Sequence, residues 1–413
     1  MEAYIISGVR TPIGSYQGTL ASVRADDLGA LVIKTVVENN PNIPKDAYDD
    51  VIMGCANQAG EDNRNVARMS LLLAGLPETV PGETVNRLCS SGLSAIIHAN
   101  RAIKAGDGHI FIAGGIENMT RGPLVVSKPS SAYGTDSKMF DTSFGWRFIN
   151  PKLHEMYGTD AMGETAENLV EKYKISREDQ DTFAFNSQMK ATAAQNSGRL
   201  AKEIVTVEIP QRKGDAIQFS KDEFIKPLTS IEGLSKLRPA FKKDGSVTAG
   251  NSSGLNDGAC AVIVASAEAV EKYNLKPLAR ILSSAVVGVA PNIMGIGPVE
   301  ATKKALAKAN LTLDKIDIIE LNEAFASQSI ACLRELGLQD NDPRVNPNGG
   351  SIAIGHPLGV TGARICYSAA LELQIQQKQY ALITMCIGVG QGYAAIIERC
   401  PPQPSQREGA KVE

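Results

Sequence analysis

The sequence predicts an α/β protein built from two similar halves, with a further lobe inserted between them. Short apolar runs alternate with longer segments of helical periodicity, which is typical of a mainly parallel sheet with crossover helices. The second part of the chain repeats the order of the first, and a charged stretch separates the two. The chain has 413 residues, a length that allows about two or three domains.

The N-terminal half is assigned to residues 1–119 together with 250–275, and the C-terminal half to 276–399. The first half has expected strands at 3–8, 51–54 and 109–114 and an expected amphipathic helix over 28–36. Three pairs of segments match: Asp50-Val51-Ile52-Met53 with Asp317-Ile318-Ile319-Glu320, Val85-Asn86 with Val345-Asn346, and Phe111-Ile112-Ala113-Gly114-Gly115 with Leu382-Ile383-Thr384-Met385-Cys386. Duplication of an α/β half explains this order better than chance does.

The stretch between the halves, residues 120–249, is charged and rich in Ser, Lys and Asp, and we assign it to an inserted lobe. Ser176-Arg177-Glu178-Asp179 is a capping-box pattern that predicts a helix start, and Gly198 predicts the end of that helix. The tail, residues 400–413, is polar and Pro-rich, so we expect it to be disordered.

Composition excludes several classes of protein. The net charge of −3 gives no reason to expect a nucleic-acid or membrane partner. The seven cysteines are odd in number and form no C-x-x-C pair, which argues against a zinc site or a disulfide framework and for reduced thiols. Without a signal peptide, an apolar run near ~18 residues or a peroxisomal C-terminus, the chain is expected to be cytoplasmic.

The first reactive segment is Val85-Asn86-Arg87-Leu88-Cys89-Ser90-Ser91-Gly92-Leu93, where an expected strand leads into a helix. A cysteine at a helix start lies near free N–H groups and the positive end of the dipole, which lowers a thiol pKa from about 8.5. Cys89 is therefore a candidate nucleophile. The alternative for any lone cysteine is a buried structural role.

The second and third segments place His356 and Cys386 beside glycines. His356 precedes an expected helix, where glycines let a ligand approach the backbone, although an ordinary histidine is the alternative. Cys386 lies at the end of an expected strand and is followed by G-x-G-x-G and a second strand. A dinucleotide-binding loop is disfavoured because a helix would follow it, and the thiol can instead transfer a proton. Together these residues predict a nucleophile (Cys89), its base (His356) and an acid or base for a second substrate (Cys386), with oxyanions stabilised by backbone N–H groups and by Asn322.

These segments resemble the thiolase family from about residue 1 to residue 399. The motifs that carry the resemblance are Asn-Arg-Leu-Cys-Ser-Ser-Gly around Cys89, Gly114-Gly115-Ile116-Glu117-Asn118-Met119, Val247-Thr248-Ala249-Gly250-Asn251-Ser252-Ser253-Gly254, Asn322-Glu323-Ala324-Phe325, Gly355-His356-Pro357 and the final Cys-x-Gly-x-Gly turn. The resemblance implies a thiolase-like fold with duplicated halves in αβαβα layers and a loop lobe over the CoA site. It also implies a homodimer or homotetramer, with CoA as a substrate and no metal or redox cofactor.

Residue by residue, the resemblance implies that Cys89 takes the acyl group and that His356 activates the Cys89 thiol. Cys386 would exchange the proton at the α-carbon of the acyl-CoA. One oxyanion hole would use His356 and a water held by Asn322, and the other the backbone N–H groups of Cys89 and Gly388. The expected substrate and CoA contacts are Ser253, Ala324, Phe325, Met162 and, at the CoA phosphates, Lys226. A solvated loop lysine is the alternative for Lys226.

Departures from the short-chain members suggest the substrate. Val389 replaces a glycine of the final turn, and Ala161 replaces a histidine before Met162. With the segments 56–65 and 145–148, these departures resemble the members that act on 3-oxoadipyl-CoA. Its second carboxylate would need a cation such as Arg64 or Arg147.

Other functions remain as alternatives. An acetoacetyl-CoA thiolase is the alternative within the family. A silent acyl-CoA-binding relative would not need both Cys89 and Cys386, and a condensing ketosynthase would normally have a histidine at position 386. A dehydrogenase is the least favoured class, since no G-x-G-x-x-G motif with an acidic partner follows a strand.

Overall fold

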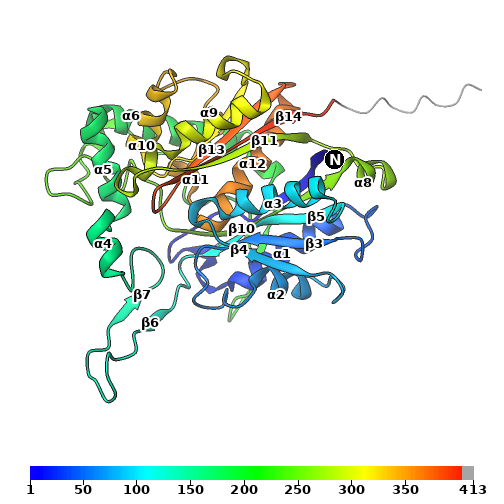
Figure 1. The fold of residues 1–413 in the computed structure, drawn as a ribbon, viewed down its shortest axis with the longest axis horizontal. Coiled ribbons are helices and arrows are strands. Elements are labelled where there is room, and N and C mark those ends of the chain that lie inside the picture. The colour runs from blue at the N-terminus through cyan, green and yellow to red at the C-terminus, as the bar shows by residue number, and fades with distance from the viewer. Residues whose placement is uncertain (402–413) are drawn as a thin grey trace, which may run out of the picture.

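The computed structural model describes residues 1–401, so the predicted disorder of the tail 400–413 falls almost entirely outside the described residues. Within the described part, no helix is both long and apolar enough to cross a membrane. One ten-stranded sheet runs through the structure in the order β12-β13-β14-β11-β1-β10-β5-β3-β4, with β2 beside β10. The two halves of this sheet meet where β1 pairs with β11 (Figure 1).

The strands of residues 1–119 and 250–275 lie next to one another and form the first half of the sheet. Its strands are β1 (Ala3–Arg10), β2 (Gly14–Ser15), β3 (Asp50–Gly54), β4 (Gly82–Val85), β5 (Ile110–Asn118) and β10 (Asn256–Ser266). Its helices are α1 (Ala25–Glu38), α2 (Val66–Leu73), α3 (Ser91–Ala105) and α8 (Ala267–Lys272). The predicted strands and helix of this half are therefore all present, because their apolar periodicity matches the faces that they bury.

The second half repeats this order with fewer strands. Its strands are β11 (Ala279–Gly288), β12 (Ile318–Leu321), β13 (Tyr380–Ile387) and β14 (Gln391–Arg399). Its helices are α9 (Gly297–Ala309), α10 (Ala326–Glu335), α11 (Ser351–Ile354) and α12 (Leu358–Ile375). The segment around Val345 forms a single parallel bridge with Ile319, where the first half has the whole strand β4.

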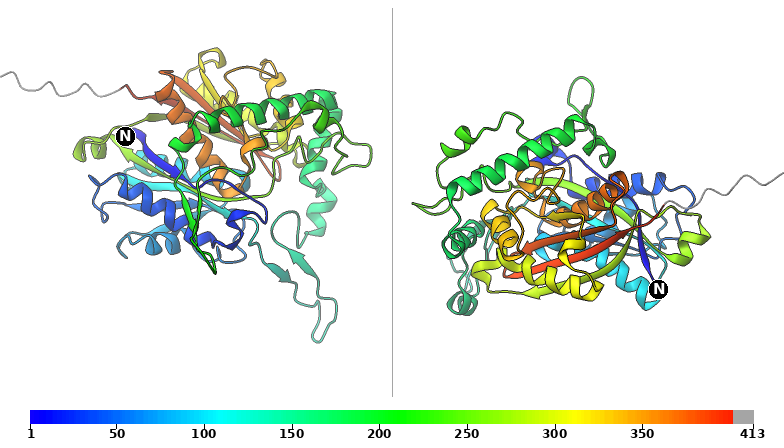
Figure 2. Two further views of the ribbon diagram at one scale, coloured as in Figure 1. Left: turned by 180° about the vertical axis from the view of Figure 1, so that it is seen from behind. Right: turned by 90° about the horizontal axis from the view of Figure 1, so that it is seen from above.

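The elements stack in five layers, which confirms the αβαβα arrangement. One core lies between α1, α2 and the outer face of the first half-sheet, and another between α9, α10 and the second half-sheet. The central core joins α3 and α12 to the inner faces of both half-sheets. In Figure 1 both helices lie between the strands of the two halves, and Figure 2 shows the same ribbon from behind and from above. A ligand site at the ends of α3 and α12 therefore receives side chains from both halves.

The expectation of a mainly parallel sheet is wrong. Among the described strands, β3 is parallel to β4 and β5, and β12 is parallel to β13. The other pairs of neighbours are antiparallel. β14 returns directly from β13 through a glycine turn, and β10 re-enters beside β1 and β5 after the lobe. Apolar alternation identifies a strand, but it does not give the strand's direction.

The duplication is confirmed by strand pairing. In the first half β3 is parallel to β5, which is antiparallel to β10. In the second half β12 is parallel to β13, which is antiparallel to β14. The residue match needs a correction of two positions, because Cys386 is the penultimate residue of β13 and Glu117, not Gly115, is the penultimate residue of β5. Few identities between the halves left the register undetermined from sequence.

Residues 120–249, assigned to the lobe from the sequence, contain four α-helices and two small two-stranded sheets that are separate from the main sheet. Its helices are α4 (Pro151–Tyr157), α5 (Met162–Tyr173), α6 (Arg177–Asn196) and α7 (Ile231–Ser235), and its strand pairs are β6 (Leu124–Val126) with β7 (Met139–Asp141) and β8 (Val207–Ile209) with β9 (Ile217–Phe219). The capping box of α6 is confirmed, with the Ser176 hydroxyl accepting from Asp179 N at 3.0 Å, and the left-handed Gly198 follows its end.

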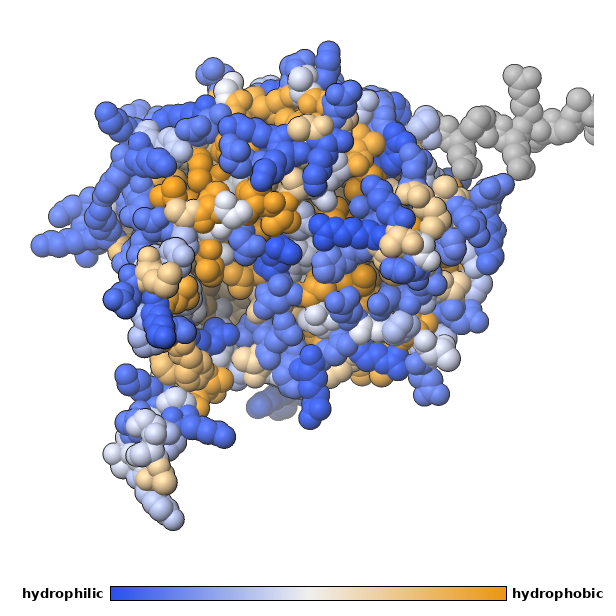
Figure 3. All heavy atoms as spheres, viewed as in Figure 1, coloured by the Kyte–Doolittle hydropathy of each residue, from blue (hydrophilic) through white to orange (hydrophobic). Residues whose placement is uncertain are grey.

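The β6–β7 hairpin projects from the body as a long arm (Figure 1). The arm and its base expose large apolar side chains, namely Leu124, Val126, Met139, Phe148 and Ile149. Apolar atoms gather where the arm meets the body in Figure 3. Such a contiguous exposed apolar surface is typical of a protein–protein contact.

Buried ion pairs attach the lobe to the two halves. Arg10 of β1 is fully buried and pairs with Asp222 at 2.7 Å and with Glu203 at 2.8 Å. Arg199, at the end of the α6 region, pairs with Glu203 at 3.1 Å and with Glu372 of α12 at 2.6 Å. A guanidinium with two carboxylate partners is well satisfied in the interior, and removing one partner of such a pair is costly. These ion pairs therefore connect the lobe to β1 of the first half and to α12 of the second half.

Candidate active site

Cys89 lies where β4 leads into α3. A short 3-10 turn, Leu88–Ser90, precedes α3, and Leu88 has φ +48°. Ser91 closes the turn, because its hydroxyl donates to Leu88 O at 2.7 Å and accepts from Arg87 N at 2.8 Å. A left-handed conformation at a leucine is strained, and strain of this kind persists when surrounding contacts impose it. The turn directs Cys89 into a cavity between the halves.

The expectation of a lowered thiol pKa at Cys89 is wrong for this structure. Enclosure of the sulfur, with a smaller contribution from the charge of Glu117, raises the pKa of Cys89 to about 11. The backbone N–H groups of Gly388 and of Cys89 itself act in the opposite direction, as hydrogen bonds to a thiolate do. The helix start is present, but desolvation outweighs it. The thiol is therefore protonated at rest and needs a base.

His356 stands between α11 and α12 with only 4% of its surface exposed. Its backbone N–H donates to Asn256 Oδ1 at 2.8 Å, and its ring Nδ1 lies 2.7 Å from Thr361 Oγ1. Burial, with a smaller effect from the charge of Arg364, lowers the pKa of His356 to about 3. The imidazole is therefore neutral and available as a base.

Asn322 follows β12 and faces the same histidine. Its Nδ2 lies 3.4 Å from His356 Nε2, and its Oδ1 accepts from the Ser351 hydroxyl at 2.6 Å. Its backbone N–H donates to Thr384 O of β13 at 3.0 Å, which fixes it to the neighbouring strand. The amide therefore presents its N–H side to the imidazole.

Cys386 lies near the end of β13 and is fully buried. It packs among Ala324, Phe325, Met294 and Met162 but is not part of the cavity lining. Burial raises the pKa of Cys386 well above its usual value, and a charge on Cys89 raises it further. The turn after β13 carries Gly388, whose N–H reaches the Cys89 sulfur. Cys386 is thus a neutral thiol close to the first cysteine.

The cavity between these residues has a volume of about 290 Å³. Its wall is mostly apolar and consists of Cys89, Met119, Phe144, Met162, Gly163, Phe241, Ser253, Gly254, Leu255, Met294, Ala324, Phe325, His356 and Leu358. Six of the residues predicted from sequence are in this wall: Cys89, His356, Met162, Ser253, Ala324 and Phe325. Three more, Asn322, Cys386 and Gly388, lie directly behind it through the contacts above.

Sequence reasoning missed several wall residues, among them Phe144, Phe241 and Met294. Phe241 is a single aromatic residue within the basic segment 236–243, and that isolation is a signal of contact with something other than solvent. The rings of Phe241 and Phe325 are 6.0 Å apart and nearly perpendicular. Nothing in the patterns around Phe144 and Met294 marks them for this cavity.

The basic residues named from sequence lie outside the wall. Lys226 is exposed, and its Nζ lies 5.1 Å from the centre of the Phe224 ring, which packs against Gly254 of the wall. Arg64 is exposed on a turn with φ +64°. Arg147 belongs to the lobe and follows the wall residue Phe144 by three positions in the sequence.

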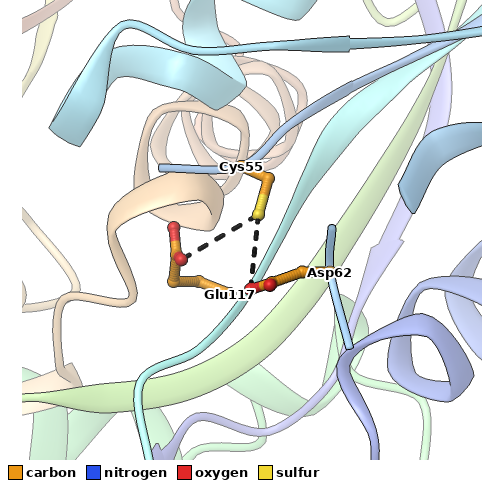
Figure 4. Close-up of side chains that lie close together, drawn as sticks. All are labelled: Cys55, Asp62 and Glu117. Atoms are coloured by element: carbon orange, nitrogen blue, oxygen red, sulfur yellow. Dashed lines mark hydrogen bonds between the residues drawn. The ribbon is translucent and has the colours of Figure 1, made fainter. Parts of the chain in front are cut away.

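Beside the cavity, Cys55, Asp62 and Glu117 form a buried cluster whose sulfur and carboxylate atoms lie within 4.8 Å of one another (Figure 4). Glu117 Oε2 accepts from Ala56 N at 2.9 Å and Gly359 N at 2.8 Å, and Oε1 accepts from Asn57 N at 3.0 Å. Burial raises the pKa of Glu117 to about 7 despite these donors. The carboxylate therefore joins the loop after β3 to the start of α12, and both of its oxygens already have partners from the chain.

Comparisons with known proteins agree with this geometry. A family model described as the N-terminal domain of thiolase matches residues 3–268, and one for the C-terminal domain of thiolase matches 275–399. A β-ketoadipyl-CoA thiolase of Acinetobacter baylyi is 59% identical over 96% of this chain and 99% of its own length. A 3-oxoadipyl-CoA/3-oxo-5,6-dehydrosuberyl-CoA thiolase of Escherichia coli is 55% identical over the same shares. The crystal structure of the Bacillus anthracis acetyl-CoA acetyltransferase superposes with a TM-score of 0.88 at 39% identity, covering 97% of this chain and 99% of that one.

Proposed function

The chain belongs to the thiolase family, and we propose that it uses CoA to cleave 3-oxoadipyl-CoA into succinyl-CoA and acetyl-CoA. It is an acyltransferase of that family. The observation that carries the choice of substrate is the 55–59% identity, over nearly the whole chain, with enzymes named for 3-oxoadipyl-CoA. The sequence departures at Ala161 and Val389 support the same substrate.

The first step is attack by the Cys89 thiol on the 3-oxo carbon. The sulfur gives its proton to His356 Nε2, which is neutral because burial lowers the pKa of His356 to about 3. The N–H groups of Cys89 and Gly388, which already point at the sulfur, donate to the oxyanion that forms on the attacked carbon. Withdrawing the proton in the same step that forms the C–S bond avoids a free thiolate in an apolar cavity.

In the second step the bond between C2 and C3 breaks and acetyl-CoA leaves as its enolate. The Cys386 thiol is buried and protonated, so it supplies the proton that the α-carbon receives. His356 and a water held by Asn322 donate to the thioester oxygen of that enolate. The succinyl group stays on Cys89 until the thiol of a second CoA molecule attacks the thioester. The proton of that thiol passes to the Cys386 thiolate, the bond between succinyl and Cys89 breaks, and His356 returns its proton to the Cys89 sulfur.

The apolar cavity wall suits the pantetheine arm. We assign contacts with that arm to Ser253, Ala324, Phe325 and Met162, all of which line the cavity. Lys226, outside the wall and behind Phe224, is assigned to the CoA phosphates, which remain near solvent. We propose that no metal or redox cofactor takes part, since a thiol, an imidazole and a second thiol supply the proton transfers.

We further propose a cytoplasmic homodimer or homotetramer. The exposed apolar side chains of the β6–β7 arm, such as Val126 and Met139, support a contact between copies of the chain. Sedimentation of the purified protein measures the oligomeric state, and the double replacement Val126→Lys with Met139→Lys should lower it.

The defining experiment compares CoA-dependent thiolysis of 3-oxoadipyl-CoA, acetoacetyl-CoA and a medium-chain 3-oxoacyl-CoA, with Cys89→Ala as the control. We expect the highest kcat/KM for 3-oxoadipyl-CoA and no cleavage by the control. A preference for acetoacetyl-CoA would keep the thiolase chemistry and overturn the substrate. If folded wild-type protein cleaves none of the three, the chain is a binding relative rather than an enzyme.

A further inference from the structure

Two buried hydroxyl groups flank the pair formed by Asn322 and His356. Thr361, in the first turn of α12, has its Oγ1 2.7 Å from His356 Nδ1 and 3.0 Å from Pro357 O. Ser351, at the start of α11, has its Oγ 2.6 Å from Asn322 Oδ1. Both side chains are fully buried, so water does not compete for their single hydrogens.

The four groups form a chain, and a chain of hydrogen bonds has a direction. In one direction the Ser351 hydroxyl donates to Asn322 Oδ1, and the Asn322 amide donates to His356 Nε2. His356 Nδ1–H then donates to Thr361 Oγ1, and the Thr361 hydroxyl donates to Pro357 O. In this direction, each of these four donors has an acceptor.

The opposite direction leaves a hydrogen without a partner. The Asn322 amide would be turned over to donate to Ser351 Oγ, and within the described residues the Ser351 hydroxyl reaches no acceptor other than Asn322. A buried hydroxyl without an acceptor costs about 1–3 kcal/mol. Thr361 would donate to Nδ1, which places a hydrogen on Nε2 and removes the lone pair that faces Asn322.

We propose that Ser351 and Thr361 are positioning residues that hold His356 as the neutral Nδ1–H tautomer, with the Nε2 lone pair directed toward Asn322 and the cavity. This inference rests on the proposed function, in which Nε2 receives the Cys89 proton. Neither hydroxyl touches the substrate. Thr361 fixes which nitrogen carries the hydrogen, and Ser351 fixes which side of the amide meets the ring.

Removing the Thr361 hydroxyl and removing the Ser351 hydroxyl should affect His356 differently. Loss of the Thr361 hydroxyl removes the acceptor for Nδ1–H, so the imidazole can place its hydrogen on Nε2, where it cannot take a proton from Cys89. Loss of the Ser351 hydroxyl leaves the tautomer in place but frees the Asn322 amide to turn. Thr361→Val should therefore lower kcat on the order of tenfold or more, with little change in KM, and Thr361→Ser should restore it.

The deciding measurement is the tautomer itself, read from ¹⁵N chemical shifts of the ring nitrogens in protein labelled at histidine. The chain has four histidines, and His356→Asn identifies the signals of His356 by their loss. We expect the wild-type Nδ1 to carry the hydrogen, the Thr361→Val variant to shift it toward Nε2, and Thr361→Ser to behave as the wild type. Thr302→Val, which removes another fully buried threonine hydroxyl in α9, controls for general loss of packing.

A wild-type His356 that carries its hydrogen on Nε2 would overturn the inference, as would a Thr361→Val variant that keeps the wild-type tautomer. Because the tautomer is measured without substrate, this result is independent of catalysis. If the tautomer behaves as expected while wild-type protein cleaves no 3-oxoacyl-CoA, the proposed function fails and the positioning role stands. If Thr302→Val shifts the His356 signals as Thr361→Val does, the effect is one of packing and the inference is overturned.

Discussion

The ring of Phe241 lies directly against Gly163, so that a methyl group at position 163 would come within 2.0 Å of the ring carbon Cγ. Gly163 lies at the start of α5, and both residues line the cavity that contains Cys89. Phe241 in turn contacts Phe325 edge to face at 6.0 Å. The absence of a side chain at Gly163 therefore sets the position of an aromatic wall.

Replacing Gly163 by alanine should displace Phe241 and distort this wall. We expect KM for acyl-CoA to rise roughly tenfold with a smaller change in kcat, because the reacting groups lie on other elements. Gly288→Ala is a matched control, since a methyl there meets only Gly390 O at 3.9 Å. Equal kinetics for the two variants would show that Phe241 does not shape the binding site.

Alkylation of Cys89 by iodoacetamide should follow the raised thiol pKa of about 11. The thiolate is the reactive form, so the rate should increase about tenfold per pH unit through the neutral range. We expect no plateau below about pH 10, with Cys89→Ala giving the background rate. A plateau near neutral pH would mean that the helix start dominates over burial, as the sequence alone suggested.

Arg147→Met should weaken recognition of a dicarboxylic acyl chain. We expect KM for 3-oxoadipyl-CoA to rise roughly threefold or more, as for a partly exposed ion pair, with KM for acetoacetyl-CoA unchanged. Arg64→Met removes the same charge from an exposed turn and serves as the comparison. Equal effects on both substrates would remove Arg147 from any role in specificity.

Removing the buried guanidinium of Arg10 should destabilise the fold. Arg10→Met leaves Asp222 without its ion-pair partner and leaves Glu203 paired only with Arg199, at a cost of about 3–5 kcal/mol. The lobe should loosen first, since both carboxylates belong to it. Lys303→Met, which breaks an exposed pair with Glu300, is the control in denaturant unfolding. Similar midpoints for the two variants would contradict the anchoring role of Arg10.

The dependence of stability on pH should include a contribution from Glu320. Burial raises the pKa of Glu320 to about 8, above the value of 4.5 for an unperturbed glutamate. The folded protein therefore binds this proton more tightly, and stability should decline as pH rises from about 4.5 to about 8, by up to 1.4 kcal/mol per unit. Glu320→Gln should lack this decline in unfolding measured across that window. Parallel profiles for variant and wild type would contradict the raised pKa.

Much of the fold could be predicted because local patterns determine it. The capping box at Ser176 and the apolar run of β1 depend on residues close in the chain. Strand direction and the register between the halves could not be predicted, since they depend on pairings between distant segments.

The site likewise contains residues that the sequence identifies and residues that it does not. Cys89, His356 and Asn322 occur in recognisable motifs, and the structure brings them together at one cavity. The wall residues Phe144 and Met294 arrive from elements far apart in sequence, with no pattern that marks them. The direction of the Cys89 pKa shift was wrong because burial by such residues is invisible along the chain.

The shared strand position of Glu117 and Cys386 has a consequence for the ancestry of the enzyme. Each is the penultimate residue of the equivalent strand in its half, yet Glu117 holds backbone N–H groups and Cys386 offers a thiol beside the nucleophile. An ancestor made of two identical halves would carry the same residue at both places. Because both halves belong to one chain, the two copies of this position can differ, and here one holds the loop after β3 while the other lies beside Cys89.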